Sequence, residues 1–245
     1  MPAASTRRSQ RSSGATRRSA AQAPAKAIPA VEPRGARRKR ETRQRLLRAA
    51  MNLMAEQGVG GVAINEITEA ADVGFGSFYN HFASKEAIYA ELVTEVVERF
   101  GEALDRLSEQ LHDPAEKIAA SVRFTLLRAR QDRVWGRFLV RTSLAGDNTH
   151  SGLGRFLFRD LKTGLARSRF KADDVAMTYV ALGGTALGAL TAEVRDDRGA
   201  FGADSKDIPE RTASMLLRML GLSAKEADTI ARRPLPEITL PPSHL

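Results

Sequence analysis

Residues 64–92, INEITEAADVGFGSFYNHFASKEAIYAEL, constrain the fold of this chain more than any other stretch. Ile64, Ile67 and the pair Ala70-Ala71 recur at three- and four-residue spacing, which predicts one short helix with a single apolar face. Asp72 follows at the point where the chain must turn. Aspartate tolerates the left-handed backbone conformation better than most residues, so a tight turn is expected there.

A second short helix is expected from near Gly74 to about Asn80. Phe78 and Phe82 lie four residues apart and are expected to face inward, while the other side chains of this helix face outward. Ser84 is a typical N-cap for a third, longer helix. Two short helices around a tight turn, the second with polar and aromatic side chains outward, are typical of the helix-turn-helix motif. In that motif the second helix lies in the DNA major groove.

The same residues carry a family resemblance. The stretch from Thr42 to Leu92 resembles the N-terminal domain of TetR-family (tetracycline-repressor-like) transcriptional regulators. The resemblance is carried by the run Ile67-x-x-Ala70-Ala71-x-Val73-x-x-Gly76-x-Phe78-Tyr79-x-His81-Phe82-x-Ser84-Lys85-Glu86. It implies a sequence-specific regulator, expected to be a repressor that a small-molecule ligand releases from its operator, although an activator role stays open. It also implies a homodimer on double-stranded operator DNA.

Three positions depart from the family pattern. Ala63 replaces the usual Thr or Ser at the start of the first motif helix, and Gly74 replaces the usual Ser at the start of the second. Asp72 replaces the usual turn glycine. Alanine at an N-cap costs about 1 kcal/mol and glycine only a few tenths, so we expect the fold to tolerate both changes. The two lost hydroxyls could otherwise have bound phosphate.

The rest of the chain indicates an all-α protein, because no alternating strand pattern appears. We expect helices at about 85–110, 114–131, 133–144, 151–169, 172–195 and 207–220. The predicted organisation is a disordered basic N-terminal arm (1–40), a three-helix helix-turn-helix domain (41–88), a helical ligand-binding and dimerisation domain (89–231) and an irregular tail (232–245). The first helix is expected from about Glu41 to Gln57, ended by Gly58.

The positive charge of the chain is concentrated in its N-terminal arm. Residues 1–40 hold 11 Lys and Arg against one acid, which leaves 27 bases and 28 acids for the remainder. The basic run adjoins the motif, so we expect Arg37, Arg38, Lys39 and Arg40 to contact DNA phosphates or a minor groove. The alternative is a solvated tail that only aids solubility.

The recognition helix offers a distinctive set of side chains for reading bases. No Arg or Lys lies between Val73 and Ala83, so the commonest bidentate contact to guanine is not available. Phe75 can contact a thymine methyl and Asn80 an adenine edge, which favours A·T pairs; the alternative is that Phe75 packs into the motif's own core. The expected DNA-contacting residues, besides the basic run, are Phe75, Gly76, Ser77, Tyr79, Asn80, His81 and Lys85.

The C-terminal helices suggest a ligand pocket and a dimer interface. Apolar and aromatic side chains of the middle helices could surround a small molecule, as the family resemblance implies, or could be plain core. The candidate pocket residues are Phe124, Leu127, Trp135, Phe138, Leu139, Phe156, Met177 and Tyr179. Small residues let helices pack closely, and the resemblance implies a four-helix dimer bundle from the last two long helices. The candidate interface residues are Gly183, Gly184, Leu187, Gly188, Ala213, Leu216 and Leu217, and the alternative is that they are ordinary intramolecular core.

Other functional classes find little support in the sequence. The four histidines are scattered, without the i, i+4 spacing of helical metal sites, and no glycine-rich phosphate loop follows a strand. We therefore expect no catalytic residues, metal or cofactor. The absence of cysteine fits a reducing cytoplasm, and no apolar run is expected to approach the roughly 18 residues of a membrane span. A nonspecific architectural DNA-binding protein, driven by the basic arm, is the remaining alternative.

Overall fold

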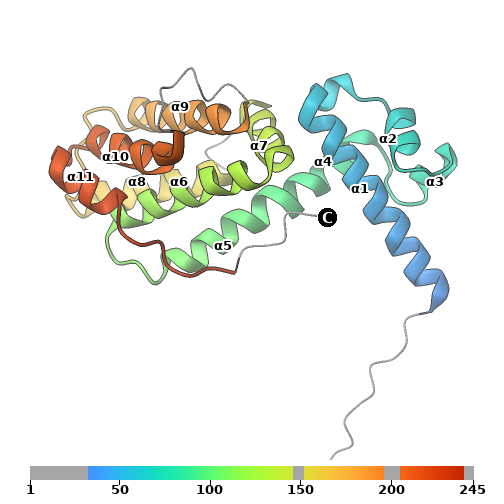
Figure 1. Ribbon diagram of the computed structural model, residues 1–245, viewed down its shortest axis with the longest axis horizontal. Helices are drawn as coiled ribbons and strands as arrows, with labels where there is room; N and C mark the ends of the chain where they lie inside the picture. The colour runs from blue at the N-terminus through green and yellow to red at the C-terminus, as the bar shows by residue number, and fades with distance from the viewer. Residues whose placement is uncertain (1–32, 146–151, 196–204, 240–245) are drawn as a thin grey trace, which may run out of the picture.

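The computed structural model describes residues 33–145, 152–195 and 205–239. Every regular element within these ranges is helical, which confirms the all-α prediction. Figure 1 shows a small lobe formed by α1 to α4 and a larger lobe formed by the remaining helices. Residues 1–32, which include most of the expected disordered arm, lie outside the described part of the chain, as do 146–151, 196–204 and 240–245.

Helix α1, Arg34–Gly61, begins earlier than the sequence indicated. The basic run Arg34–Arg40, assigned by sequence to a disordered arm, instead forms the first two turns of this helix, and all its residues are exposed. The i, i+4 ion pair from Arg37 Nε to Glu41 Oε1, at 2.7 Å, supports these turns. Gly58 breaks the helix with φ 75°, as expected, and one more turn follows the kink.

The motif helices are α2 (Ile64–Ala70), α3 (Phe75–Tyr79) and α4 (Lys85–Leu92). The turn between α2 and α3 places Asp72 at φ 52°, the left-handed conformation expected for it. Arg45 of α1 donates from Nη1 to the Asp72 carbonyl at 3.1 Å, so the turn is anchored to the supporting helix. Helix α4 continues without a loop into a π-helical segment, η1 (Val93–Glu98), and then into α5 (Arg99–Ser108).

The larger lobe is built from seven further elements. They are α6 (Pro114–Gln131), α7 (Arg133–Ala145), α8 (Gly152–Ala166), α9 (Val175–Val194), η3 (Ser205–Asp207), α10 (Ile208–Met219) and α11 (Ala224–Ala231). Helix α11 was not predicted separately, although Ser223 is an N-cap whose Oγ accepts from the Glu226 N–H at 3.3 Å. Beyond α11 the chain runs without helix to Thr239.

Two apolar clusters hold the molecule together. The first joins both lobes, since it includes Leu46 and Met54 of α1, Phe78 of α3, and Trp135 and Phe138 of α7. The second lies at the far end of the larger lobe and is formed by parts of α6, α8, α9, α10 and α11. Because the first cluster crosses from lobe to lobe, a change in the larger lobe can reach the motif helices through packed side chains.

Candidate nucleic-acid interface and effector groove

Helix α3 has one buried face and one exposed face. Phe78 is fully buried and Phe82, just after the helix, is nearly so. Phe75 and Tyr79 lie on the outer face, 54% and 52% exposed, with their rings 5.7 Å apart in an edge-on arrangement. The exposure of Phe75 excludes the alternative in which it packs into the motif core. Two aromatic side chains are therefore exposed to solvent on the outer face of the second motif helix.

The remaining α3 candidates surround this aromatic pair. Gly76 and Asn80 are exposed, and Ser77 is partly buried. A side chain at Gly76 would meet nothing within 4 Å, so this glycine leaves an open surface rather than serving internal packing. The start of α3 at Gly74 has no side-chain cap, and its neighbour α2 is capped only by the Glu66 carboxylate, which accepts from the Ala63 N–H at 2.7 Å.

His81 lies between the motif and the basic end of α1. Its Nδ1 is buried and has no hydrogen-bond partner. Burial, together with the positive charges of Lys39 and Arg43, lowers the pKa of His81 below its ordinary value. The imidazole is therefore neutral at physiological pH in the free protein. A phosphate placed nearby would offset the positive charges of Lys39 and Arg43 and so favour the protonated form of His81.

Lys85 has a different environment from the one predicted. Its Nζ donates to the Val62 carbonyl at 2.8 Å and is partly buried. The ammonium thus ties the start of α4 to the loop before α2, and its role at a phosphate stays a prediction. Arg43 also makes contacts within the small lobe. Its guanidinium pairs with Glu91 and lies over the Phe82 ring, with Cζ 4.7 Å from the ring centroid.

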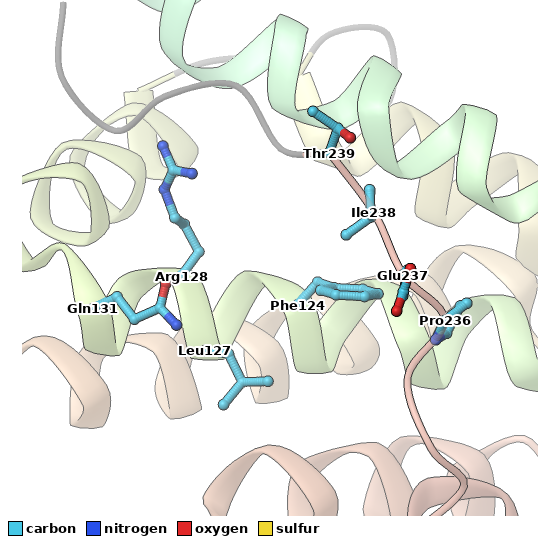
Figure 2. A pocket seen from close by; sticks show the side chains of 8 residues that line it. All are labelled: Phe124, Leu127, Arg128, Gln131, Pro236, Glu237, Ile238 and Thr239. Atoms are coloured by element: carbon cyan, nitrogen blue, oxygen red, sulfur yellow. The ribbon is translucent and has the colours of Figure 1, made fainter.

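A groove of about 650 Å³ lies between α6 and the extended chain that follows α11 (Figure 2). Its lining comprises Phe124, Leu127, Arg128, Gln131, Pro236, Glu237, Ile238 and Thr239. Phe124 and Leu127 are thus the two predicted pocket residues that the groove contains. The sequence did not indicate that the C-terminal tail would form the opposite wall, because nothing in its composition fixes where it packs.

The other predicted pocket residues lie elsewhere. Trp135, Phe138 and Leu139 are 1–3% exposed and belong to the core that joins the lobes. Phe156 is wedged against Gly101, where an added Cβ would lie 2.6 Å from its ring. Met177 is 62% exposed on α9, and Tyr179 packs on Phe158 with ring centroids 5.2 Å apart. None of these six residues lines the groove beside α6, and their assignment to a pocket wall stays a prediction.

Arg128 connects the groove with the core. Its guanidinium lies 5.5 Å from the Trp135 ring centroid and 6.0 Å from that of Phe100. Burial lowers the pKa of Arg128, with the carboxylate of Asp132 acting in the opposite direction. Trp135 in turn donates from Nε1 to the Val96 carbonyl at 3.3 Å, inside the π-helical segment η1.

The exposed face of α9 is apolar and continues onto α10. Met177, Val180, Gly184 and Gly188 follow each other at three- and four-residue spacing, and all four are exposed. Met215 and Met219 of α10 add two more exposed apolar side chains, 50% and 36% exposed. The α9–α10 face is defined by these six residues. An added Cβ at Gly183, Gly184 or Gly188 would meet nothing within 4 Å.

The three predicted interface residues of α10 are not on this face. Ala213, Leu216 and Leu217 are at most 1% exposed and pack in the second core cluster, so assigning them to the interface was wrong.

The expectation that no apolar run approaches the length of a membrane span needs correction. Helix α9 is 20 residues long with a mean hydropathy of 1.5, long and apolar enough to pass for a membrane span by length and composition. Only 17% of its most apolar window is buried.

The fold and the interface together define a two-domain helix-turn-helix protein, and comparison with known proteins identifies its family. The description "Bacterial regulatory proteins, tetR family" matches residues 46–92, and "Tetracyclin repressor-like, C-terminal domain" matches residues 113–233. The crystal structure of RolR in complex with resorcinol is 37% identical, with a TM-score of 0.61, over 83% of this chain and 100% of that one. The chain belongs to the TetR family.

Curated relatives match mainly through the N-terminal domain. The transcriptional repressor DhaR of Mycobacterium sp. (strain GP1) is 39% identical over 71 residues, 29% of this chain and 34% of DhaR. The transcriptional regulator TcmR of Streptomyces glaucescens is 31% identical over 100 residues, 41% of this chain and 44% of TcmR. The chain therefore spans less than half the length of either of these two relatives.

Proposed function

We propose that this protein is a cytoplasmic, homodimeric DNA-binding repressor that leaves its operator when a small molecule binds the larger lobe. The observation that carries the proposal is helix α3. It is held by Phe78 on a helix-turn-helix frame and exposes Phe75 and Tyr79. His81, just after the helix, lies close enough to Lys39 and Arg43 of α1 for their charges to lower its pKa. Exposing two aromatic rings to water is unfavourable in the free protein, and they contribute little to its core. A binding role therefore explains their position better than a structural role.

The side chains of α3 favour A·T pairs within each half-site. The Phe75 ring contacts a thymine methyl, and the Asn80 amide bonds an adenine edge. Tyr79 and Ser77 hold phosphates and set the register, with Arg38 and Lys39 of α1 adding contacts that carry no sequence information. Because the two residues on α1 lie on an exposed helix rather than a coil, their spacing along the DNA backbone is fixed by α1.

The α9–α10 face supplies the dimer contact. No charged residue lies between Val175 and Ala192, and the glycines offer room for a helix from a second copy. A second chain covers this face better than lipid does. Helix α9 already packs one side against the larger lobe through Leu182 and Leu190, and its Glu193 is fully buried in an ion pair with Arg130 at 2.6 Å.

Helix α7 contacts both the segment that continues α4 and the helix that supports the motif, which gives a route for release. Trp135 of α7 bonds the Val96 carbonyl of η1, and Arg141 of α7 donates from Nη2 to the Glu56 carbonyl of α1 at 2.7 Å. A ligand that moves α7 therefore shifts both α1 and η1. Changing the separation of the two α3 helices lowers operator affinity, a coupling typically of about 1–3 kcal/mol.

RolR, the relative solved with resorcinol, supports a small aromatic ligand for this chain. The test begins with selection of duplexes from a random pool by the full-length protein. We expect an inverted repeat with A·T-rich half-sites, and release of that duplex by millimolar resorcinol or a related hydroxybenzene. If the selection enriches no sequence, and the affinity for DNA depends on salt concentration alone, the result would instead favour a nonspecific architectural DNA-binding protein.

A further inference from the structure

The C-terminal segment Leu235–Thr239, here called the strap, runs along one side of the groove and faces α6 (Figure 2). Its start is fixed firmly. Arg123, whose side chain is 9% exposed, donates from Nη1 to the Arg233 carbonyl at 2.7 Å and pairs with Glu210 at 2.9 Å. The strap therefore leaves α11 from a defined point beside α6.

The strap itself is held by packing alone. Pro234 and Pro236 have no backbone N–H, and among the described residues no hydrogen bond fixes 235–239. Leu235 and Ile238 pack against the cluster that joins the lobes. A segment that follows the anchored Arg233 and is held by two apolar side chains can adjust around an occupant without breaking hydrogen bonds.

The polar groups of the groove stand at its two ends. Figure 2 shows Arg128 and Gln131 at one end and Glu237 at the other, with Phe124 and Ile238 between them. The guanidinium and the carboxylate oppose each other in charge, so the lining as a whole favours a neutral occupant over an anion. Guanidinium and amide donate hydrogen bonds, carboxylate and amide accept them, and a hydroxyl group can satisfy either.

We propose that the strap is a wall of the effector site, and that the groove binds a neutral aromatic molecule with hydroxyl groups at opposite edges. The inference rests on the proposed ligand-responsive function and adds the location of the site and the side chains that select a neutral, hydroxylated ring. The aromatic ring lies between Phe124 and Ile238. One hydroxyl meets Arg128 or Gln131, and the other meets Glu237.

Trp135 makes this proposal measurable. It is the only tryptophan of the chain, is 1% exposed, and lies 5.5 Å from the guanidinium of Arg128. An occupant that reaches Arg128 changes the surroundings of the indole, and so its fluorescence. The same indole holds the Val96 carbonyl of η1, so the reporter stands on the connection between groove and motif.

The experiment titrates the full-length protein with resorcinol, and separately with benzoate, by calorimetry and Trp135 fluorescence. Ile238→Ser and a chain ending at Pro234 perturb the strap, and Leu144→Ser, on exposed α7 surface, is the matched control. Resorcinol should bind wild type and the control alike. It should bind Ile238→Ser about tenfold more weakly, because part of an apolar side chain is lost from the wall. Ile238→Ser should melt near wild type, and it remains informative if the shortened chain does not fold.

Equal resorcinol affinity in wild type and Ile238→Ser would overturn the strap as a wall of the site. Tighter binding of benzoate than of resorcinol, or no binding of resorcinol at millimolar concentration, would overturn the ligand class. Operator affinity without ligand is measured on the same samples. If ligand-free wild type does not bind the operator, the proposed function is contradicted, but the resorcinol affinities still decide whether the strap is a wall of the groove.

Discussion

In the described part of the chain, α3 and the α9–α10 face each group several exposed apolar side chains, and the two surfaces differ in what surrounds them. On α3, Phe75 and Tyr79 are exposed, and the nearby His81 is within reach of the positive charges of Lys39 and Arg43 on α1. On the α9–α10 face, Met177, Val180 and Met215 adjoin glycines, and α9 carries no charge before Glu193. The comparison teaches that the neighbours of an exposed apolar group indicate its partner. A basic rim favours a polyanion, and a small-residue rim favours another helix.

The largest effect is expected from the α9–α10 face. Val180→Glu places a charge on the proposed dimer contact, while Leu144→Glu places one on exposed surface elsewhere. Val180→Glu should give a monomer by sedimentation and lose about 100-fold or more in operator affinity, because a dimer gains from two linked half-sites. Gly184→Leu should act in the same direction, since its own chain leaves room for the side chain. A Val180→Glu protein that stays dimeric would place the dimer contact elsewhere.

Ala213 offers a contrast within the same helix pair. It is fully buried in the second core cluster, so Ala213→Glu should lower the melting temperature rather than dissociate a folded dimer. A folded monomeric Ala213→Glu protein would mean that this side of α10 faces a partner after all.

The basic turns of α1 should produce the next largest effect. Arg38→Gln with Lys39→Gln removes two exposed charges per chain from the first turns of α1. Each lost phosphate contact should reduce the slope of log affinity against log salt by about 0.9, on operator and random DNA alike. Arg106→Gln with Lys225→Gln, exposed on α5 and α11, is the charge-matched control. Unchanged slopes in the α1 variant would show that these turns do not touch DNA.

Phe75 tests base reading on the α3 surface. Because its side chain is 54% exposed, Phe75→Ala should leave the melting temperature nearly unchanged. It should lose about 1 kcal/mol or more at one or two thymine positions, and uracil at those positions should reproduce the loss with wild type. Phe78→Ala, its buried neighbour, should instead cost about 3–5 kcal/mol of stability. Early melting of Phe75→Ala with unchanged base preference would refute the assignment.

The smallest effect concerns His81 and pH. Its pKa is lowered in the folded chain, so the unfolded chain takes up the proton more readily below the ordinary value of 6.5. The stability of wild type should therefore fall as pH drops through the range below 6.5, and His81→Gln should flatten that fall. Operator phosphates offset the positive charges of Lys39 and Arg43 and so favour protonated His81. The affinity for operator DNA should therefore rise as the pH falls through this range. Parallel thermal melts of the two proteins from pH 7.5 to 5 provide the check.

The motif was predictable from sequence because local rules determine it. Turn conformation at Asp72, capping at Ser84 and the burial of Phe78 each follow from spacing and residue type within a few positions. The helicity of Arg34–Arg40 was missed because a run of like charges indicates disorder on its own. In the chain it continues a packed helix and is offset by Glu41.

The larger lobe was less predictable, since its site depends on contacts between distant segments. Small residues on α9 do face solvent, but the leucines of α10 that looked equally suitable turn inward to the second core. The pocket aromatics Trp135 and Phe138 proved to be core, and the groove instead uses the tail after α11. Apolar side chains at helical spacing do not reveal which face a neighbouring helix covers.

The central claim is that two α3 helices act as one rigid reader, joined through the α9–α10 face. The most direct measurement compares wild-type affinity for the selected operator with its affinity for the same operator after 5 base pairs are inserted between half-sites, about half a helical turn. The account predicts a loss of about 100-fold, because the half-sites then face opposite sides of the duplex. Affinity that is unchanged by the insertion would show that the heads bind independently, and would contradict the account.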